Sequence, residues 1–329
     1  MKSVKHLLGF ILVLIIIATG FIAYKIFIPY DIGSERHSVM IKDNDTFPAI
    51  LKNLNDAGVL HGDYIFKLMV VFSGVDKKLS PGRYDFVGQI SLYDVLRKLK
   101  NRDIATLMVT IPEGLTIYKT AGLIADKLDI DSSVFAALAV DTTFTQDKYN
   151  INGLEGYLFP ETYRLWYGIN ADQIIDIMLS EYNHKTDGLF SQLPDYINSK
   201  KSLLALASII EAEARLDDEK PIISSVYHNR LKRKMRLQAD PTVIYALGGL
   251  DRPLYYKDLE YDSPYNTYKY AGLPPGPINS PGLASIKAAI NPAETNYLYF
   301  VADGTGRHIF SHTLTEHNRA KRKVKRDKN

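Results

Sequence analysis

The sequence predicts an α+β protein with a single N-terminal transmembrane helix, a small α+β module and then a helix-rich α+β domain. Three observations support this fold class. An uncharged apolar stretch covers residues 7–24, strand and helix patterns alternate between residues 36 and 104, and amphipathic helical patterns dominate from residue 105 onward. Apolar residues at i, i+3 and i+4 indicate helices, whereas strict alternation indicates strands.

The composition is that of an ordinary folded protein. The chain has 329 residues, of which 46% are hydrophobic and 23% charged, enough for two domains with their own cores. A net charge of +3 is too small to indicate nucleic-acid binding. The absence of cysteine excludes disulfides, thiolate metal sites and a cysteine nucleophile.

The N-terminal stretch predicts a membrane anchor. Residues 7–24 would span about 27 Å as a helix, close to a bilayer core of about 30 Å. Lys2 and Lys5 precede the stretch, so the positive-inside rule places residues 1–6 in the cytoplasm and residues 30–329 across the membrane. We expect the anchor to cover residues 7–28. A cleaved signal peptide is the alternative, because the small residues "ATG" occur at 18–20.

Residues 36–104 are predicted to form the membrane-proximal α+β module. Thr46 is a plausible N-cap for a helix in which Phe47, Ile50 and Leu54 recur at helical spacing. A helical stretch (63–72), a strand (80–86) and a second helix (91–100) follow, and we place the boundary at 101–103.

Residues 105–320 are predicted to form the helix-rich domain. Two aromatic loops interrupt its helices, "LEGYLFPETYRLWYG" (154–168) and "YDSPYNTYKYAGLPPGPINSPG" (261–282). Loops of this length inside a compact domain are usually functional, and a packed Ω-loop is the structural alternative. A hairpin is expected at 297–312, turning at "DGTG". The basic tail, 321–329, is predicted to be a frayed, solvated end, with weak attraction to an anionic surface as the alternative.

Two glutamates near the end of one predicted helix have different surroundings. On a helix over 203–215, Glu213 lies on the apolar stripe with Leu206, Ile209 and Ile210. Glu211 lies on another face and is expected to be a surface charge paired with Arg215 at i+4. An apolar wall raises a carboxyl pKa, as a general acid at neutral pH requires. Glu213 is therefore a candidate acid, and a helix-end carboxylate open to water is the alternative.

Several long segments resemble one known family. The segments "LEGYLFPETY" (154–163), "ASIIEAEA" (207–214), "VYHNRLKRKMRLQADPTVIYALG" (226–248), "SPYNTYKYAGLPPGPINSPG" (263–282) and "SIKAAINPAETNYLYFVADGTGRHIFSHTLTEHN" (285–318) are similar to those of endolytic murein transglycosylases of the MltG/YceG type. The match covers nearly the whole chain after the anchor.

The resemblance implies a single-pass inner-membrane protein whose catalytic domain lies on the periplasmic, extracytoplasmic side. It implies that residues 36–104 are LysM-like and that residues 105–320 are a YceG-like catalytic domain with a lysozyme-like cleft. The implied reaction cuts the β-1,4 bond between N-acetylmuramic acid (MurNAc) and N-acetylglucosamine (GlcNAc) in glycan strands of peptidoglycan. The implied partners are peptidoglycan synthases (penicillin-binding proteins), beside which the enzyme would set glycan strand length.

The resemblance also implies site residues. The second Glu of the family's E-x-E motif is catalytic and falls on Glu213, while Ala212 stands where many members have Lys. The sugar-binding elements of lysozyme-like transglycosylases correspond to Gln238 and to Tyr265–Asn266. The remaining candidates for substrate binding are Thr267, Tyr157 and Glu161, and simple packing is an equal alternative for Tyr157.

The chemistry needs one carboxyl group and no cofactor or metal. A glycosidase normally uses two carboxylates, and the sequence offers Asp217, Asp218, Asp240, Asp258 and Glu260 as the second. Asp240 precedes Pro241 and is expected to cap a helix. A lytic transglycosylase avoids the requirement, because the C6 hydroxyl of muramic acid closes onto C1 and leaves a 1,6-anhydro end. One glutamate can then act first as acid and next as base.

Other functions remain open on the residues alone. A hydrolytic muramidase would need a second carboxylate, and a non-catalytic, membrane-anchored peptidoglycan-binding scaffold would tolerate Gln at position 213. A metal hydrolase could use His308, His312 and His317, but i, i+4 ligand spacing needs a helix and 308–312 has a strand pattern. The sequence has no G-x-S-x-G motif for a serine hydrolase.

Overall fold

A computed structural model describes residues 2–62, 64–75, 79–128, 130–191, 193–194 and 196–327. Residue 63 of the predicted helix 63–72, residues 328–329 of the predicted tail and residue 1 therefore lie outside the described residues. The chain divides into two compact units, each described by itself. Unit 1 comprises Met1–Met108 and Arg164–Asn170, and unit 2 comprises Val109–Tyr163 and Ala171–Asn329. Mixed helix and sheet confirms the predicted α+β class in its general form.

Unit 1 begins with the long apolar helix α1 (Lys2–Phe27). The segment Lys5–Phe27 has a mean hydropathy of 2.7, and its side chains are exposed. The helix is long and apolar enough to cross a membrane, which is consistent with the predicted anchor.

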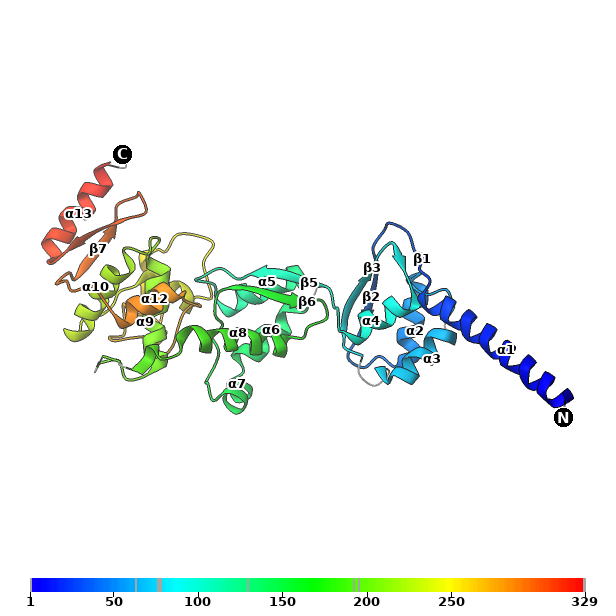
Figure 1. The fold of residues 1–329 in the computed structure, drawn as a ribbon. Coiled ribbons are helices and arrows are strands. Elements are labelled where there is room, and N and C mark those ends of the chain that lie inside the picture. Colours follow the sequence, from blue (N-terminus) through cyan, green and yellow to red (C-terminus); the bar gives the residue numbers. More distant parts are fainter. Residues whose placement is uncertain are drawn as a thin grey trace. The chain divides into compact units, whose positions relative to one another are not determined.

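The rest of unit 1 is a small mixed layer of short strands and helices (Figure 1). Its elements are β1 (Tyr30–Asp31), β2 (His37–Ile41), α2 (Phe47–Asp56), α3 (Tyr64–Ser73), β3 (Gly82–Phe86), β4 (Gln89–Ile90), α4 (Leu92–Lys100) and the first part of β5 (Thr106–Thr110). Strands β2 and β3 pair antiparallel, with Val39 opposite Tyr84. The helices bury Leu54, Phe66 and Leu99 in the same core as this pair. The helices present apolar residues at helical spacing, and the strands present alternating apolar residues, so both can bury one face in the shared core.

Two helix starts in unit 1 differ in how they are capped. Ser91 and Asp94 form a capping box at the start of α4, since each side chain bonds the other residue's backbone N–H. Thr46 occupies the N-cap position of α2 as predicted, but its side chain makes no capping hydrogen bond.

Unit 2 is mainly helical. Its first part contains the end of β5, α5 (Ile117–Leu128), α6 (Ser132–Val140), α7 (Thr142–Tyr149), β6 (Thr162–Trp166), α8 (Ala171–Thr186) and η2 (Leu189–Ser191). Its second part contains α9 (Lys200–Glu213), α10 (Lys220–Lys232), α11 (Asp240–Ala246), η3 (Tyr256–Glu260), α12 (Leu283–Ile290), β7 (Tyr299–Ala302), β8 (His308–Ser311) and α13 (Leu314–Asp327). Strand β5 pairs with β6, and the division between the units falls within both strands.

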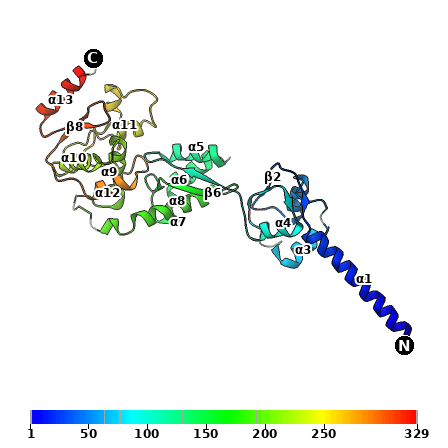
Figure 2. The ribbon, with the colours of Figure 1, turned by 45° about the horizontal axis from the view of Figure 1, so that its top comes forward.

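Helix α9 is the central element of the second part. Every residue from Leu203 to Ile210 is buried, and α10 and α12 pack against the helix (Figures 1 and 2). The loop before α12 also docks here, because Ser208 accepts the Ile278 N–H and its carbonyl accepts the Asn279 amide. A helix buried on all sides is held rigidly, so the groups at its ends have fixed positions.

The last part of unit 2 is a hairpin with a helix packed on it. Strands β7 and β8 pair antiparallel, with Tyr299 opposite Ser311, which confirms the predicted hairpin. The prediction of a frayed basic tail is wrong for the described residues, because α13 runs to Asp327. Ala320 and Val324 lie one turn apart and are buried, which holds the otherwise charged helix in place.

Candidate active site

Glu213 is the last residue of α9. Ser199 caps the start of this helix by accepting the Ser202 N–H, and Ala214 is extended, which ends the helix directly after Glu213. The Glu213 side chain is half-buried. Its Oε1 accepts a hydrogen bond of 3.3 Å from the Tyr227 hydroxyl of α10. The predicted placement of Glu213 beside apolar structure is thus found.

Glu213 opens into a cleft of about 480 Å³. Its walls come from α9, α10, the segment before α11, the hairpin and α13. The lining residues are Glu213, Tyr227, Arg230, Leu237, Gln238, Asp240, Tyr268, Tyr299, Phe300, Val301, Ala302, His308, Leu314, His317, Asn318 and Lys321. A half-buried carboxyl group in a cleft of this size can meet part of a large substrate.

The surroundings of Glu213 favour its protonated form. Burial, and to a smaller extent the charge of Asp240, raise the pKa of this carboxyl to about 7. The Tyr227 hydrogen bond and the Arg230 charge oppose these effects. Near neutral pH a substantial fraction of Glu213 therefore carries a proton that it can donate, which suits a general acid.

Glu211 is not the surface charge that the sequence predicted. Its side chain is only 9% exposed. Its Oε2 accepts the Gly282 N–H at 3.0 Å and the Ser285 hydroxyl at 2.7 Å. Within the described chain its cationic partner is the buried Lys220, 3.4 Å away, and not the expected Arg215. The prediction failed because helix periodicity does not reveal which distant segments cover a face.

Glu211 and Lys220 belong to a network that fixes the end of α9. The Lys220 ammonium group also lies 3.6 Å from Glu113 and 2.9 Å from Asp217. The Glu113 carboxyl rests directly on Gly282, where an added Cβ would lie 1.8 Å from its Oε1. A side chain at position 282 would displace the Glu113 carboxyl from the network, which connects three segments beside Glu213.

Asp240 shares the cleft with Glu213. It is the first residue of α11, whose N-cap is Ala239, so the expectation that Asp240 caps this helix is wrong. Its side chain is exposed and accepts a hydrogen bond from the Tyr268 hydroxyl. The other four predicted second carboxylates, Asp217, Asp218, Asp258 and Glu260, are not among the residues that line the cleft.

Gln238 also lines the cleft, as the resemblance implied. Its backbone is left-handed, with φ of 48°, and its N–H donates to the Thr267 carbonyl. A non-glycine residue in this conformation is uncommon and needs support from its surroundings. Here the support places the exposed Gln238 side chain beside Asp240.

Tyr265, Asn266 and Thr267 do not line this cleft. Asn266 is fully buried, and its amide donates to the carbonyls of Leu259 and Tyr261. Thr267 is buried as well, and its Oγ1 accepts the Ala239 N–H at 3.0 Å. These two residues shape the segment that presents Gln238 and Asp240. Tyr265 lines a neighbouring pocket.

Tyr157 and Glu161 also lie outside the cleft. Tyr157 is 8% exposed and packs edge-on against Tyr182, in agreement with the packing alternative. Glu161 forms an ion pair of 3.0 Å with Lys185. Lys185 and the Thr162 N–H hold the pKa of the Glu161 carboxyl below its usual value.

Sequence reasoning missed the contribution of the C-terminal segment to the cleft. The His308 Nδ1 donates to the carboxylate of the buried Glu219 at 2.8 Å, and this carboxylate also accepts the His308 backbone N–H. Leu314, His317, Asn318 and Lys321 share one stripe of α13 and line the cleft. The i, i+3, i+4, i+7 spacing was available as a signal, but the high charge of the tail hid it.

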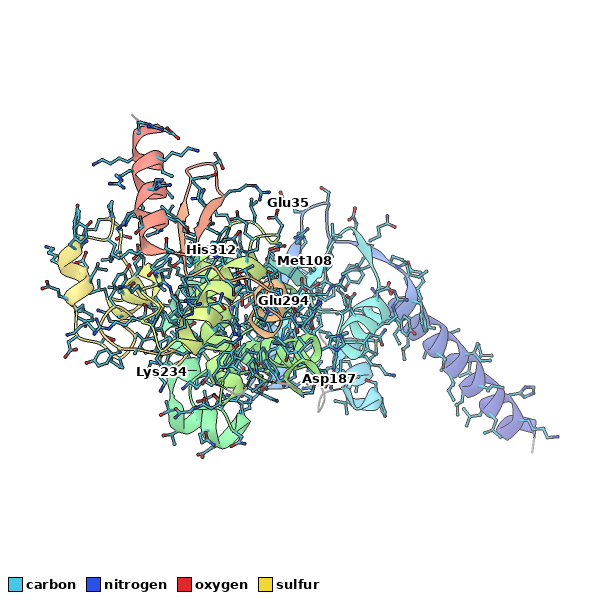
Figure 3. All side chains as sticks on the ribbon, turned by 90° about the vertical axis from the view of Figure 1, so that its left-hand side faces the viewer. Glu35, Met108, Asp187, Lys234, Glu294 and His312 are labelled. Carbon is cyan, nitrogen blue, oxygen red and sulfur yellow. The ribbon has the colours of Figure 1, made fainter. Side chains whose placement is uncertain are left out.

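The three histidines considered as metal ligands have separate partners. His312 lies between β8 and α13 (Figure 3) and stacks on Tyr297, whereas His317 stacks on Tyr299. The His317 Nδ1 is buried and has no hydrogen-bond partner within the described part of the chain. Among the described residues no group of three or more His, Asp or Glu side chains could hold a metal ion.

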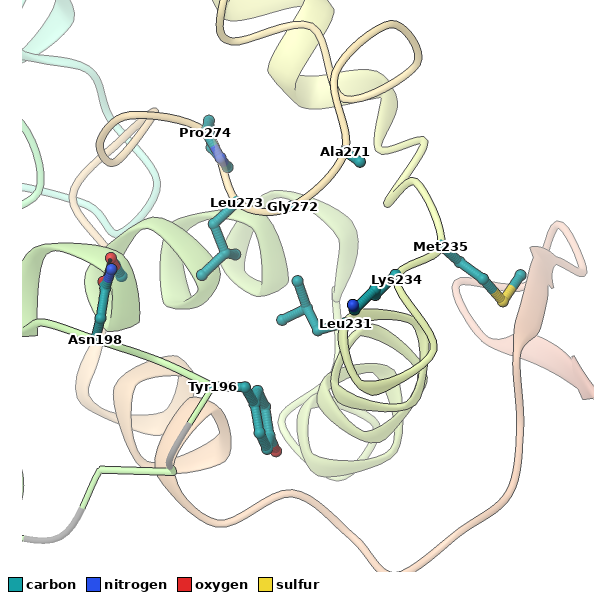
Figure 4. A pocket seen from close by; sticks show the side chains of 10 residues that line it. Tyr196, Asn198, Leu231, Lys234, Met235, Ala271, Gly272, Leu273 and Pro274 are labelled. Carbon is teal, nitrogen blue, oxygen red and sulfur yellow. Dashed lines mark hydrogen bonds between the residues drawn. The ribbon is translucent and has the colours of Figure 1, made fainter.

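A second cavity of about 470 Å³ lies between the end of α10 and the loop 271–274 (Figure 4). Tyr196, Leu231 and Leu273 line it together with Lys234. No carboxylate is present among the described residues that line it. This cavity therefore lacks the acid that the cleft at Glu213 contains.

The known proteins to which this chain is similar are YceG-like proteins or endolytic murein transglycosylases. Residues 39–323 match the model of the YceG-like family. An endolytic murein transglycosylase of Bacillus subtilis is 36% identical over 309 residues, covering 89% of this chain and 86% of that protein. One from Streptococcus pneumoniae is 28% identical, covering 92% of this chain but only 62% of that protein. A crystal structure of a yceG-like protein from Listeria monocytogenes, 34% identical, superposes with a TM-score of 0.60 and covers 87% of this chain and 98% of that one.

Proposed function

The chain belongs to the YceG-like family, and on that premise we propose that it is an endolytic murein transglycosylase whose catalytic residue is Glu213. The general activity, a lyase reaction on peptidoglycan, follows from the relatives. The observation that supports the catalytic assignment is a carboxyl group with a pKa of about 7 that opens into a cleft. The cleft would be the lysozyme-like cleft that the sequence resemblance implies.

In the proposed reaction Glu213 acts twice. The protonated carboxyl donates its proton to the oxygen of the β-1,4 bond that leaves C1 of MurNAc, and positive charge develops at C1. The resulting carboxylate then accepts the proton of the C6 hydroxyl as O6 bonds to C1. The products are a GlcNAc end and a 1,6-anhydro-MurNAc end, and Glu213 is protonated again, so no water is consumed.

Other residues of the cleft would position the sugars. Gln238 offers an amide, and the His317 ring forms part of the wall. Asn266 and Thr267 would act through the segment that they hold, because both are buried. Positioning contributes to rate by holding O6 close to C1 during bond cleavage.

Hydrolysis is the second candidate reaction, and Asp240 favours its consideration. Asp240 is a second carboxylate in the same cleft, exposed to solvent and able to hold a water molecule. A muramidase would use such a pair to deliver water to C1 and would leave a reducing end. The non-catalytic scaffold is the third reading, in which Glu213 binds glycan without proton transfer.

Unit 1 would serve the same function by keeping the enzyme close to its substrate. Helix α1 would span the inner membrane with residues 1–6 in the cytoplasm, and unit 2 would lie on the extracytoplasmic, periplasmic side. Residues 36–104, with two helices packed on the β2–β3 pair, would be the LysM-like module. Cleavage beside penicillin-binding proteins would set the length of nascent strands.

The mass of the products separates these readings. The full chain in detergent, its Glu213→Gln variant and a matched Glu260→Gln control are incubated with purified peptidoglycan, and the fragments are weighed. We expect ends lighter by one water molecule than reducing ends, formed by the wild type and the control but not by Glu213→Gln. Reducing ends would indicate a muramidase, and retention of uncut glycan by all three proteins would indicate the scaffold.

A further inference from the structure

A pocket of about 280 Å³ surrounds Glu155 in unit 2, outside the cleft of Glu213. Tyr118, Tyr245 and Tyr265 line it, and Lys201 stands at one side. The rings of Tyr245 and Tyr265 lie 5.0 Å apart at 50°. Tyrosine faces beside charged groups are the kind of surface that binds sugars, because rings pack on C–H faces and the charged groups bond hydroxyls.

The Glu155 carboxyl forms part of this pocket and is also held by the backbone. Its oxygens accept the Ile117 N–H at the start of α5 and the Tyr245 hydroxyl at 3.3 Å. Burial raises the pKa of Glu155 to about 7. Two hydrogen bonds fix its orientation while it still lines the pocket, so it can accept or donate a further bond to a ligand.

Three segments, namely α9, α11 and the loop between η3 and α12, each contribute residues both to this pocket and to the cleft. Helix α11 supplies Tyr245 to the pocket and Asp240 to the cleft, and the loop between η3 and α12 supplies Tyr265 and Tyr268 in the same way. Tyr268 bonds Asp240 at one end, and Tyr245 packs on Tyr265 at the other. The loop and α11 therefore run side by side from the cleft to the pocket.

Helix α9 indicates how far the pocket around Glu155 lies from the cleft at Glu213. It supplies Lys201 to the pocket and Glu213 to the cleft, twelve residues later. At about 1.5 Å per residue the two positions are about 18 Å apart along the helix axis. This distance corresponds to a few sugar rings, so a glycan strand is long enough to span the two sites.

The shape of the pocket depends on a glycine. A Cβ at Gly276 would lie 3.0 Å from Cε of Lys201 and 3.2 Å from the Tyr265 hydroxyl. Contacts this short would force the two side chains to move. Gly276 thus keeps open the space between the ammonium group and the ring.

We propose that the pocket around Glu155 is a second glycan-binding site, which holds the strand whose bond lies at Glu213. This proposal rests on the proposed function, since it assigns a second contact to the same substrate. The pocket would take a sugar unit of the strand several rings from the bond that is cut. Its distance from Glu213 would then influence the length of the fragment released.

Binding to uncut strands tests the proposal without requiring turnover. The Glu213→Gln full chain is compared with Glu213→Gln/Tyr118→Ala on long glycan strands and on a murein disaccharide, which is too short to reach both sites. Tyr118 is 66% exposed, so its removal leaves the core unchanged. Tyr256, 91% exposed and outside the residues lining both sites, supplies the matched control Tyr256→Ala.

We expect Tyr118→Ala to weaken binding of long strands by roughly tenfold, the order of effect of losing one aromatic contact. Binding of the disaccharide should not change, and the Tyr256→Ala control should match its parent on both ligands. Gly276→Ala, checked for an unchanged unfolding midpoint, should reproduce the length-dependent loss. No loss on long strands, or an equal loss on both ligands, would overturn the proposal.

The failure of this proposal is distinguishable from the failure of the proposed function. Wild-type protein that forms 1,6-anhydro ends while Tyr118→Ala leaves long-strand binding unchanged would refute only the second site. Wild-type protein that cuts nothing, but loses long-strand binding on Tyr118→Ala, would refute the reaction and support the site.

Discussion

Glu213 and Glu155 have the same raised pKa of about 7 but different surroundings. Burial is the main cause in both cases. Glu213 has one long hydrogen bond from Tyr227 and a negative neighbour in Asp240, and it opens into the larger cleft. Glu155 accepts a backbone N–H from the first turn of α5 as well as the Tyr245 hydroxyl, so it also supports a helix start.

The difference teaches that a shifted pKa indicates a special environment without naming its use. A carboxyl bound to a helix N-terminus is restricted in orientation and contributes to stability. A carboxyl with few partners can move its proton to and from a substrate. Four measurements can break or sharpen this distinction.

The largest expected effect is on catalysis. Glu213→Gln should lower kcat by about a hundredfold to ten-thousandfold, the usual contribution of a general acid or base. Glu155→Gln should leave kcat on a short murein oligosaccharide within a few-fold of wild type, because it does not touch the bond that is cut. A comparable loss of kcat in both variants would contradict the distinction.

The next effect is on the pH dependence of stability. Each carboxyl has a pKa raised from 4.5 to about 7 by folding, so the folded chain binds these protons more tightly than the unfolded chain. The contribution of each carboxyl to the free energy of unfolding should be fully present below about pH 4.5 and should fall as the pH rises to about 7, by at most about 1.4 kcal/mol per pH unit. Urea unfolding followed by circular dichroism measures this slope.

Each Glu→Gln variant should flatten the slope by a similar amount. Above about pH 7, where Glu155 is ionised, Glu155→Gln should in addition lose about 1 kcal/mol of stability, because a neutral amide is a weaker partner than a carboxylate for the α5 backbone. An unchanged slope in either variant would mean that the group titrates near its usual value in the folded chain.

A smaller effect separates the two carboxyls by charge. Asp240 raises the pKa of Glu213 but is not a cause of the raised pKa of Glu155. Asp240→Asn should therefore lower the pKa of Glu213, and the alkaline limb of the rate–pH profile should move to lower pH by less than about one unit. If Asp240 instead delivers water, Asp240→Asn should lose most of its activity. The maximum rate in its rate–pH profile would then fall.

The smallest expected effect concerns the two tyrosine hydroxyls. Both hydrogen bonds lower the pKa of their glutamate, so Tyr227→Phe should raise the pKa of Glu213 and Tyr245→Phe that of Glu155 by a few tenths of a unit. Only Tyr227→Phe should move the alkaline limb of the rate profile, toward higher pH. Carboxyl NMR shifts measured on both variants would check each pKa directly.

The features predicted correctly from sequence depend on local periodicity. The helix that carries Glu213, its apolar face and the hairpin near the C-terminus all follow from the spacing of neighbouring residues, although the helix was predicted to run to residue 215 and ends at Glu213. The resemblance added Gln238, which lies in the cleft. The burial of Glu211 could not be predicted in this way, because its partners lie between nine and 74 residues away in the chain.

The wrong expectations for residues 266–267 and for the C-terminal tail have the same physical cause. Asn266 and Thr267 look like polar loop residues suited to sugars, yet they satisfy buried backbone groups of other segments. The tail looks soluble by charge, yet two small apolar residues are enough to pack it on the hairpin. In each case the outcome depends on a tertiary contact that composition does not contain.

The position of α13 has a consequence for the order in which the enzyme is made. Glu213 and its supporting helices precede the stripe Leu314–Lys321 by about a hundred residues, and this stripe forms one wall of the cleft. During translation the proposed acid therefore emerges before the cleft is complete. In the proposed function, a newly made chain would gain its full substrate-binding surface only when the last helix reaches the hairpin.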